Sequence, residues 1–487
     1  MNLKITILFF GLALFGFAMS DCTQQTKTPV KPNIILIFAD DQCYETIHAL
    51  GNDEIITPTL DKMVDEGVSF THTYNMGGWN GAVCIASRSM LNSGRFIWRA
   101  HNAEKRFPQL AAEGKMWGNL MQEAGYSTYM TGKWHIKVAP EKCFNTVSHE
   151  RPGMPNQTKE GYNRPLSKND TIWEPWHKKY GGFWKGGKHW SEVLKDDALA
   201  FIDSASQKDE PFFMYLAFNA AHDPRQSPKK YVDMYPLENI AVPETFLPEN
   251  PDQDFIGCGK NLRDERLAPF PRTEYAVKVN RQEYYAIITH MDEQIRQILE
   301  ALKKSGKADN TYIFFSADHG LANGNHGLMG KQNMYDHSVR APMIVIGPDI
   351  PKNRKVDADV YIQDIMATAL ELAGIEKPEY VEFNSLLSLA KGTQTKSNYN
   401  AIYSCYTTKQ RMIRTNGFKL IAYPDAHKVL LFDMNKDPLE MNNLADVKTY
   451  AKKKKQLFDN LLKLQESMDD TLNLMPLYNA VITDYTE

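Results

Sequence analysis

Four short apolar runs, separated by stretches with helical periodicity, constrain the fold of this chain more than any other feature. They span residues 33–38, 126–130, 212–218 and 311–315. Continuous apolar runs of this length are typical of strands buried on both faces. The stretches between them include amphipathic patterns such as residues 284–304, which end at a Ser-Gly pair. The pattern therefore predicts an α/β fold with a large, mostly parallel sheet sandwiched by helices.

Polar side chains follow each of the four runs. Open parallel sheets bind ligands beyond the carboxyl ends of their strands, so we expect these side chains to meet at one edge. They are Asp40 and Asp41, Lys133 and His135, His222, and Asp318 and His319. Asp40 and Asp41 alone would also fit a helix cap or a turn. Together, paired carboxylates with one imidazole suit a divalent cation such as Ca²⁺ better than zinc, because the chain has no thiolate cluster.

The segment around Cys84 is similar to a known signature. It reads Cys-Ile-Ala-Ser-Arg from Cys84 to Arg88 and continues to Ser-Gly-Arg at residues 93–95. This resembles the sulfatase signature, in which an enzyme oxidises the cysteine to formylglycine (3-oxoalanine). Ala86 stands where most sulfatases have proline, and alanine at this position is compatible with the oxygen-independent, radical-type maturation enzymes. The alternative is a buried, unreactive cysteine in a helix-opening turn.

Further motifs resemble the same family over nearly the whole chain. Residues 132–135, Gly-Lys-Trp-His, and residues 327–333 around Lys331 match elements that bind sulfate through a lysine. Residues 412–420 and 431–444 resemble the family's C-terminal strand pair and closing turn. The resemblance implies an alkaline-phosphatase-like fold with a smaller C-terminal α+β part. It assigns the metal to Asp40, Asp41, Cys84, Asp318 and His319.

The resemblance also implies a role for each remaining residue. A hydrated formylglycine carries two hydroxyls: one attacks sulfur, and the other expels sulfate as the C=O bond reforms. Arg88 and the metal would stabilise the ionised diol. Lys133 and Lys331 would bind the sulfate oxygens. His222 would protonate the leaving alcohol, and His135 would take a proton from the second hydroxyl. Each residue alone would also fit an ordinary surface lysine or loop histidine.

The substrate is harder to predict than the reaction. Tryptophans gather in residues 173–190, where they would either stack on sugar rings or pack as a cover on the core. Asp223 and Arg225 directly follow His222 and are candidates for contacts with sugar hydroxyls or a carboxylate. Residues 263–272 form a second charged segment that is suited to recognition. The resemblance favours a bacterial carbohydrate sulfatase acting on a sulfated glycan or oligosaccharide.

The overall charge excludes broad attraction to polyanions. The chain has 487 residues and a formal net charge of −3, so we expect no nucleic-acid partner, and an anionic substrate needs a local basic pocket.

Four cysteines besides Cys22 and Cys84 are widely spaced: Cys43, Cys143, Cys258 and Cys405. Three disulfide pairings are open, but the spacing fits neither a disulfide scaffold nor a zinc module.

The N-terminus predicts export. Residues 1–21 place a lysine before an apolar run and end in small residues, as a secretory signal does. Residues 19–22 also resemble a degraded lipoprotein box, with Cys22 as the lipid-bearing residue. We therefore expect a periplasmic protein, or one held to the bacterial outer membrane by lipid alone. The mature chain is predicted to contain a catalytic domain at 31–375 and a C-terminal subdomain at 376–487, with the boundary near a Pro-containing polar stretch.

Two other functions remain open from the sequence. Phosphonate monoester and phosphodiester hydrolases of the same superfamily also use formylglycine and one metal. A chain with an unmodified Cys84 could instead serve as a surface glycan-binding protein. The combination of metal ligands, two lysines and two histidines argues against a binding protein, because a lectin needs no such set.

Overall fold

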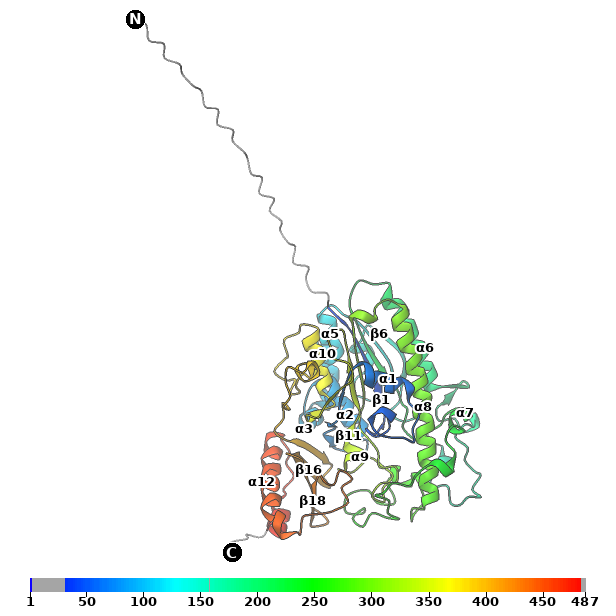
Figure 1. Ribbon diagram of the computed structural model, residues 1–487, viewed down its shortest axis with the longest axis vertical. Coiled ribbons are helices and arrows are strands. Elements are labelled where there is room, and N and C mark those ends of the chain that lie inside the picture. Colours follow the sequence, from blue (N-terminus) through cyan, green and yellow to red (C-terminus); the bar gives the residue numbers. More distant parts are fainter. Residues whose placement is uncertain (2–30, 157, 483–487) are drawn as a thin grey trace. The chain divides into compact units, whose positions relative to one another are not determined.

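An eight-stranded mixed sheet forms the centre of the computed structural model, which describes residues 1, 31–156 and 158–482 (Figure 1). From edge to edge it contains β13 (Arg354–Val356), β2 (Val68–Phe70), β12 (Met343–Ile346), β10 (Thr311–Ala317), β1 (Asn33–Ala39), β9 (Phe212–Ala217), β5 (Ser127–Lys133) and β6 (Thr146–Arg151). β10, β1, β9, β5 and β6 are parallel, whereas β12 is antiparallel to both of its neighbours. The four predicted strands are therefore adjacent in the centre of the sheet.

The register of the central strands brings their carboxyl ends level. Ala39 at the end of β1 lies opposite Ala317 at the end of β10. Gly132 of β5 lies opposite Ala217 at the end of β9. A Cβ atom on Gly132 would lie 1.9 Å from the carbonyl oxygen of Ala217, so only glycine fits this approach. The polar residues that follow these strands consequently start from one edge of the sheet.

Helices cover both faces of this sheet, as predicted. α1 (Pro58–Glu66), α6 (Trp190–Ser206) and α8 (Glu274–Lys304) pack on one face, and α2 (Val83–Ser93), α5 (Trp117–Glu123) and α10 (Asp364–Leu372) pack on the other (Figure 1). α8 begins ten residues before the predicted start at residue 284. Thr273 caps it, because its side chain accepts a hydrogen bond from the amide of Ala276 at 3.1 Å.

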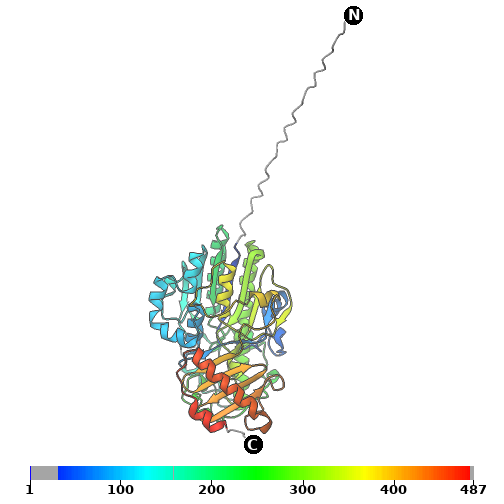
Figure 2. The same ribbon diagram turned by 90° about the vertical axis from the view of Figure 1, so that its left-hand side faces the viewer.

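A second sheet is built mainly from the C-terminal part of the chain. It contains β18 (Lys428–Asp433), β17 (Phe418–Tyr423), β16 (Gln410–Thr415), β15 (Ile402–Tyr406) and β4 (Gly77–Gly78), in that order. α12 (Ala451–Ser467) lies across its face (Figure 2). β4 comes from the N-terminal part, so the two regions share this sheet. The predicted boundary near residue 375 stays a prediction.

The remaining features concern cysteines and the termini. The five cysteines that the structure describes are all free and buried. No helix among the described residues combines the length and the apolar character needed to span a bilayer. The predicted signal segment at 1–21 and Cys22 lie outside the described residues, apart from Met1.

Candidate active site

Five side chains converge beyond the ends of β1 and β10 and at the start of α2. Asp40 and Asp41 follow β1, Asp318 and His319 follow β10, and Cys84 is the second residue of α2. One potential ligand atom from each residue lies within 4.8 Å of all the others. All five residues are buried. The structure thus brings together the complete set that was predicted to bind a metal.

The chemistry of this cluster fits a hard divalent cation. The Oδ1 atom of Asp40 is buried and accepts no hydrogen bond from any residue that the structure describes. Burial, followed by the charges of Asp318 and Cys84, raises the pKa of the Asp40 carboxyl well above its usual value. Carboxylate oxygens with one imidazole are the ligands that a hard divalent cation prefers. Asp40, Asp41, Asp318 and His319 could therefore hold such a cation together with residue 84.

Three buried cations surround the cluster. Arg88 on α2 donates from Nε to Asp318 Oδ2 at 3.0 Å and from Nη1 to the carbonyl of Lys133 at 2.8 Å. The ammonium of Lys133, the last residue of β5, pairs with Asp40. The Nζ atom of Lys331 lies 2.8 Å from both carboxylate oxygens of Asp41. The predicted arginine and both predicted lysines therefore line the same centre.

Cys84 lies between these cations and the carboxylates. Its sulfur is 3.3 Å from Nε2 of His319 and 3.4 Å from Nζ of Lys331. Burial opposes ionisation, but the charges of Lys133 and Lys331 lower the pKa of the Cys84 thiol well below its ordinary value. The surroundings of residue 84 therefore stabilise a negative charge at this point.

His222 is held by the residue that follows it. Its Nδ1 atom lies 3.0 Å from Asp223 Oδ1, and its Nε2 atom lies 3.9 Å from Asp41 Oδ2. The hydroxyl of Tyr162 donates to the other oxygen of Asp223. Burial and the charge of Lys331 lower the pKa of His222, but Asp223 and Asp41 raise it to about 9 overall. Asp223 therefore orients His222 so that Nε2 faces the cluster.

His135 lies close to Cys84, and its pKa shifts in the opposite direction to that of His222. Its backbone has a φ of 60°, two residues after the end of β5. Burial and the charge of Lys133 lower its pKa, against a hydrogen bond with Cys84. A Cβ atom on Gly153 would lie 2.1 Å from the His135 ring, so glycine is needed there. A neutral imidazole beside residue 84 is suited to accept a proton.

The charged segment 263–272 has a structural role that sequence reasoning missed. Asp264 accepts a hydrogen bond from Gln332 Nε2 at 2.7 Å and lies 3.9 Å from Nζ of Lys331. The carboxylate of Glu265 accepts hydrogen bonds from the backbone amides of residues 329 and 330 at 3.0 and 2.9 Å. Buried carboxylates thus fix the loop that carries Lys331. The only sequence signal was the charge of the segment, which suggested recognition.

Arg225 is buried at 2% exposure, away from solvent. Its Nη1 atom donates to Asn280 Oδ1 and Asn323 Oδ1, both at 3.2 Å. The guanidinium lies over the ring of Tyr284, whose hydroxyl donates to the carbonyl of Asp41 at 2.5 Å. Through Tyr284 these contacts support Asp41, and they hold the segment after His222 in place. The role of Arg225 and Asp223 as substrate contacts stays a prediction.

The tryptophan-rich segment packs on the protein. Trp173, Trp184 and Trp190 are 6, 8 and 5% exposed. The indole nitrogen of Trp173 donates to Glu283 Oε1 at 2.9 Å. Within this segment, β7 (Trp184–Lys185) and β8 (Lys188–His189) pair as a short hairpin. Of the two alternatives from the sequence, the structure favours the packed cover for these three side chains.

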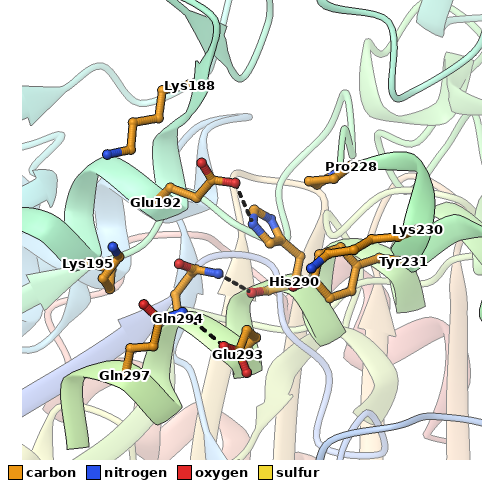
Figure 3. A pocket seen from close by; sticks show the side chains of 10 residues that line it. All are labelled: Lys188, Glu192, Lys195, Pro228, Lys230, Tyr231, His290, Glu293, Gln294 and Gln297. Atoms are coloured by element: carbon orange, nitrogen blue, oxygen red, sulfur yellow. Dashed lines mark hydrogen bonds and ion pairs between the residues drawn. The ribbon is translucent and has the colours of Figure 1, made fainter. Parts of the chain in front are cut away.

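A cavity of about 240 Å³ lies apart from the cluster (Figure 3). Its walls come from α6, α8, the neighbouring α7 (Lys229–Val232) and residues 188 and 228, and they include both lysines and glutamates. His290 from α8 pairs with Glu192 from α6 at 3.2 Å in its wall. None of the predicted site residues lines this cavity. The catalytic candidates therefore belong to the buried cluster alone.

Solved structures share the fold. A protein solved in complex with its substrate D-glucosamine-2-N,6-O-disulfate aligns with a TM-score of 0.67 and 23% identity, over 91% of this chain and 99% of that one. The phosphonate monoester hydrolase of Agrobacterium radiobacter aligns with a TM-score of 0.71 and 18% identity, over 90% and 96% of the two chains. The fold is alkaline-phosphatase-like, as predicted.

Sequence comparisons identify the family. An N-acetylglucosamine-6-O-sulfatase of Bacteroides thetaiotaomicron is 26% identical, over 94% of this chain and 91% of the relative. An arylsulfatase of Clostridium perfringens is 27% identical, over 91% and 96%. The C-terminal model of N-sulphoglucosamine sulphohydrolase matches residues 324–467. The sulfatase model matches residues 32–375, which include every predicted site residue. The chain belongs to the sulfatase family and is a sulfuric ester hydrolase.

Proposed function

We propose that this protein is an exported sulfatase that removes sulfate from a sulfated glycan or oligosaccharide through a formylglycine at position 84. One observation carries the proposal. The residue that matches the family's modified cysteine lies within 4.8 Å of four potential metal ligands and 3.4 Å from a buried lysine. A relative is named for a sulfated amino sugar, and a structural neighbour binds one, which supports a sulfated carbohydrate as the substrate.

Two groups complete the site under this proposal. Asp40, Asp41, Asp318 and His319 would hold Ca²⁺ together with residue 84, and a formylglycine-generating enzyme would convert Cys84 to 3-oxoalanine. When both are present, they supply a metal-activated hydroxyl nucleophile. The predominance of oxygen ligands favours Ca²⁺ over softer metals. Export and a lipid tether at Cys22 rest on residues 1–22.

The side chains of the site divide the remaining work. Lys133 and Lys331 bind the sulfate oxygens and neutralise the charge that develops on them. Arg88 bridges Asp318 and the backbone carbonyl of Lys133, and its buried positive charge stabilises negative charge at residue 84. The protonated His222 donates from Nε2 to the leaving oxygen, and the neutral His135 accepts a proton at residue 84.

The proposal is tested by sulfate release from a panel of defined sulfated mono- and disaccharides, with a phosphonate monoester and a phosphodiester as competing substrates. We expect release from at least one sugar, and much slower phosphonate and phosphodiester hydrolysis. Faster hydrolysis of either competitor would instead favour the alternative reaction. The Cys84→Ala variant separates an enzyme from a glycan-binding protein, because it should abolish hydrolysis while binding of the sugar persists.

A further inference from the structure

We infer that Arg263 selects substrates that carry a second anionic group, a carboxylate or a sulfate, on the sugar that bears the scissile ester. This inference rests on the proposed sulfatase activity and adds a specificity-determining residue to it. The residue lies in the charged segment that precedes α8. Its guanidinium lies near Nε2 of His222, the atom that protonates the leaving oxygen in the proposed reaction.

The exposure of Arg263 distinguishes it from the other cations of the site. Its side chain is 31% exposed. The buried cations are Arg88, Lys133 and Lys331, which are 0, 0 and 1% exposed. Arg263 Nη2 lies 3.5 Å from Nε2 of His222, the atom that faces the leaving oxygen. A substrate that places its ester oxygen at His222 therefore places the attached sugar beside Arg263.

The guanidinium is held in place but keeps donors for a ligand. Its Nε and Nη2 atoms contact Asp264 Oδ1 at 2.7 and 2.5 Å, and Nη2 lies 3.6 Å from Asp223 Oδ1. Among the described residues, its Nη1 atom makes a polar contact with the sulfur of Met154, at 2.6 Å. A thioether is a weak acceptor. A carboxylate or sulfate oxygen of the substrate would therefore be a much stronger partner for Nη1 than Met154.

Two buried aspartates orient the guanidinium of Arg263. Asp223 is shared between Arg263 and His222, and Asp264 is shared between Arg263 and Lys331. The ammonium of Lys331 also contacts both carboxylate oxygens of Asp41 at 2.8 Å. The guanidinium of Arg263 is permanently charged, so an anion is a stronger partner than a neutral hydroxyl at its exposed edge. The planar donor geometry of arginine suits both carboxylates and sulfates.

The test compares substrates that differ only in the second anion. One pair is glucosamine 6-sulfate with and without N-sulfate. The other pair is a 2-O-sulfated hexuronate as the free acid and as its methyl ester. For each pair we would measure the ratio of kcat/KM in the wild type and in Arg263→Gln, Arg263→Lys and Lys260→Gln. Lys260 is the matched control, because it lies three residues away and forms an exposed ion pair with Glu249.

We expect the wild type to prefer the charged member of at least one pair, mainly through KM. Arg263→Gln should reduce this preference by about 10- to 100-fold, the range for a charge-assisted hydrogen bond. Arg263→Lys should keep part of it, and Lys260→Gln should keep all of it. The pair that responds identifies the anion as sulfate or carboxylate. A preference that Arg263→Gln leaves unchanged, or the absence of any preference in the wild type, would overturn the inference.

A binding measurement separates this inference from the proposed function. The Cys84→Ala variant, with and without Arg263→Gln, would be titrated with both members of each pair by calorimetry in the presence of Ca²⁺. A tighter complex with the charged member that depends on Arg263 supports the inference even if the wild type releases no sulfate. Equal affinities in both variants contradict it, whatever the outcome of the activity assay.

Discussion

His222 and Asp223 form a buried pair in which Nδ1 lies 3.0 Å from Oδ1, with both side chains at most 3% exposed. The pair leaves Nε2 of His222 facing the cluster that contains residue 84. Because Asp223 carries the charge that favours a protonated imidazole, it should matter most when the leaving group needs a proton. This arrangement leads to a prediction about leaving-group dependence.

Asp223→Asn should lower kcat for a sugar sulfate by about 10- to 100-fold, because an alcohol leaves poorly without a proton donor. The same variant should lose no more than about 5-fold on 4-nitrophenyl sulfate, whose leaving group is a weak base. His222→Ala should show the same contrast with a larger amplitude. Steady-state kinetics on both substrates check this. Equal losses on the two substrates would show that Asp223 supports the fold of the site instead.

Removal of divalent cations should destabilise the protein. Without a cation the carboxylates of Asp40, Asp41 and Asp318 share a buried cluster within 4.8 Å. Saturation with Ca²⁺ at about 100 times its Kd adds roughly 2.7 kcal/mol to the free energy of unfolding. We expect EGTA to lower Tm by about 3 °C. Differential scanning fluorimetry during a Ca²⁺ titration measures this change in Tm. The Tm of the Asp318→Asn variant should change little with Ca²⁺. An identical Tm with EGTA and with Ca²⁺ would argue against the site.

Lys419 should be essential for stability. It is fully buried in β17, and its Nζ atom lies 2.8 Å from Asp336 Oδ1 and 2.7 Å from Glu440 Oε1. Lys419→Met leaves two buried carboxylates without their cation, which should cost about 3–5 kcal/mol in the free energy of unfolding. Lys428→Gln breaks a partly exposed pair with Asp252 and should cost about 1 kcal/mol or less. Urea denaturation measures the loss in the free energy of unfolding for both variants. Equal losses would contradict the prediction.

His326 should make stability depend on pH. Burial is the main cause that lowers its pKa from 6.5 to about 4. The unfolded chain takes up the proton near pH 6.5, whereas the folded chain does so only near pH 4. Stability should therefore be complete above pH 6.5 and fall by about 3 kcal/mol as the pH is lowered to about 4. The difference in stability between the wild type and His326→Gln should follow this curve. A difference that is constant from pH 7 to 4 would rule out the contribution.

Sequence patterns predicted the centre of the fold, and which side chains gather at its edge, for a physical reason. Strands buried on both faces must be apolar throughout, so β1 and β10 are visible as continuous runs. Reactive polar residues directly after them, such as Asp40 and Asp318, are then expected at one edge. The family motifs added Lys331 and Cys84, which local pattern alone does not connect. The structure places both lysines and all five proposed metal ligands together.

Other features depend on contacts between distant segments and could not be predicted. The sequence marks Asp264 and Glu265 only as part of a charged segment suited to recognition, whereas the structure buries both against the loop that carries Lys331. The contacts of Arg225 with Asn280, Asn323 and Tyr284 also join segments that are far apart in the chain. The antiparallel direction of β12 could likewise not be predicted from its own residues. A single sequence carries no record of such pairings.

The mass of the peptide that contains residue 84, measured alongside sulfate release from sulfated sugars, tests the central claim most directly. The protein would be produced together with a formylglycine-generating enzyme. We predict a loss of about 18 Da at Cys84, together with sulfate release that the Cys84→Ala variant lacks. A converted residue 84 with no release from any sulfated sugar, or full release by Cys84→Ala, would contradict the account.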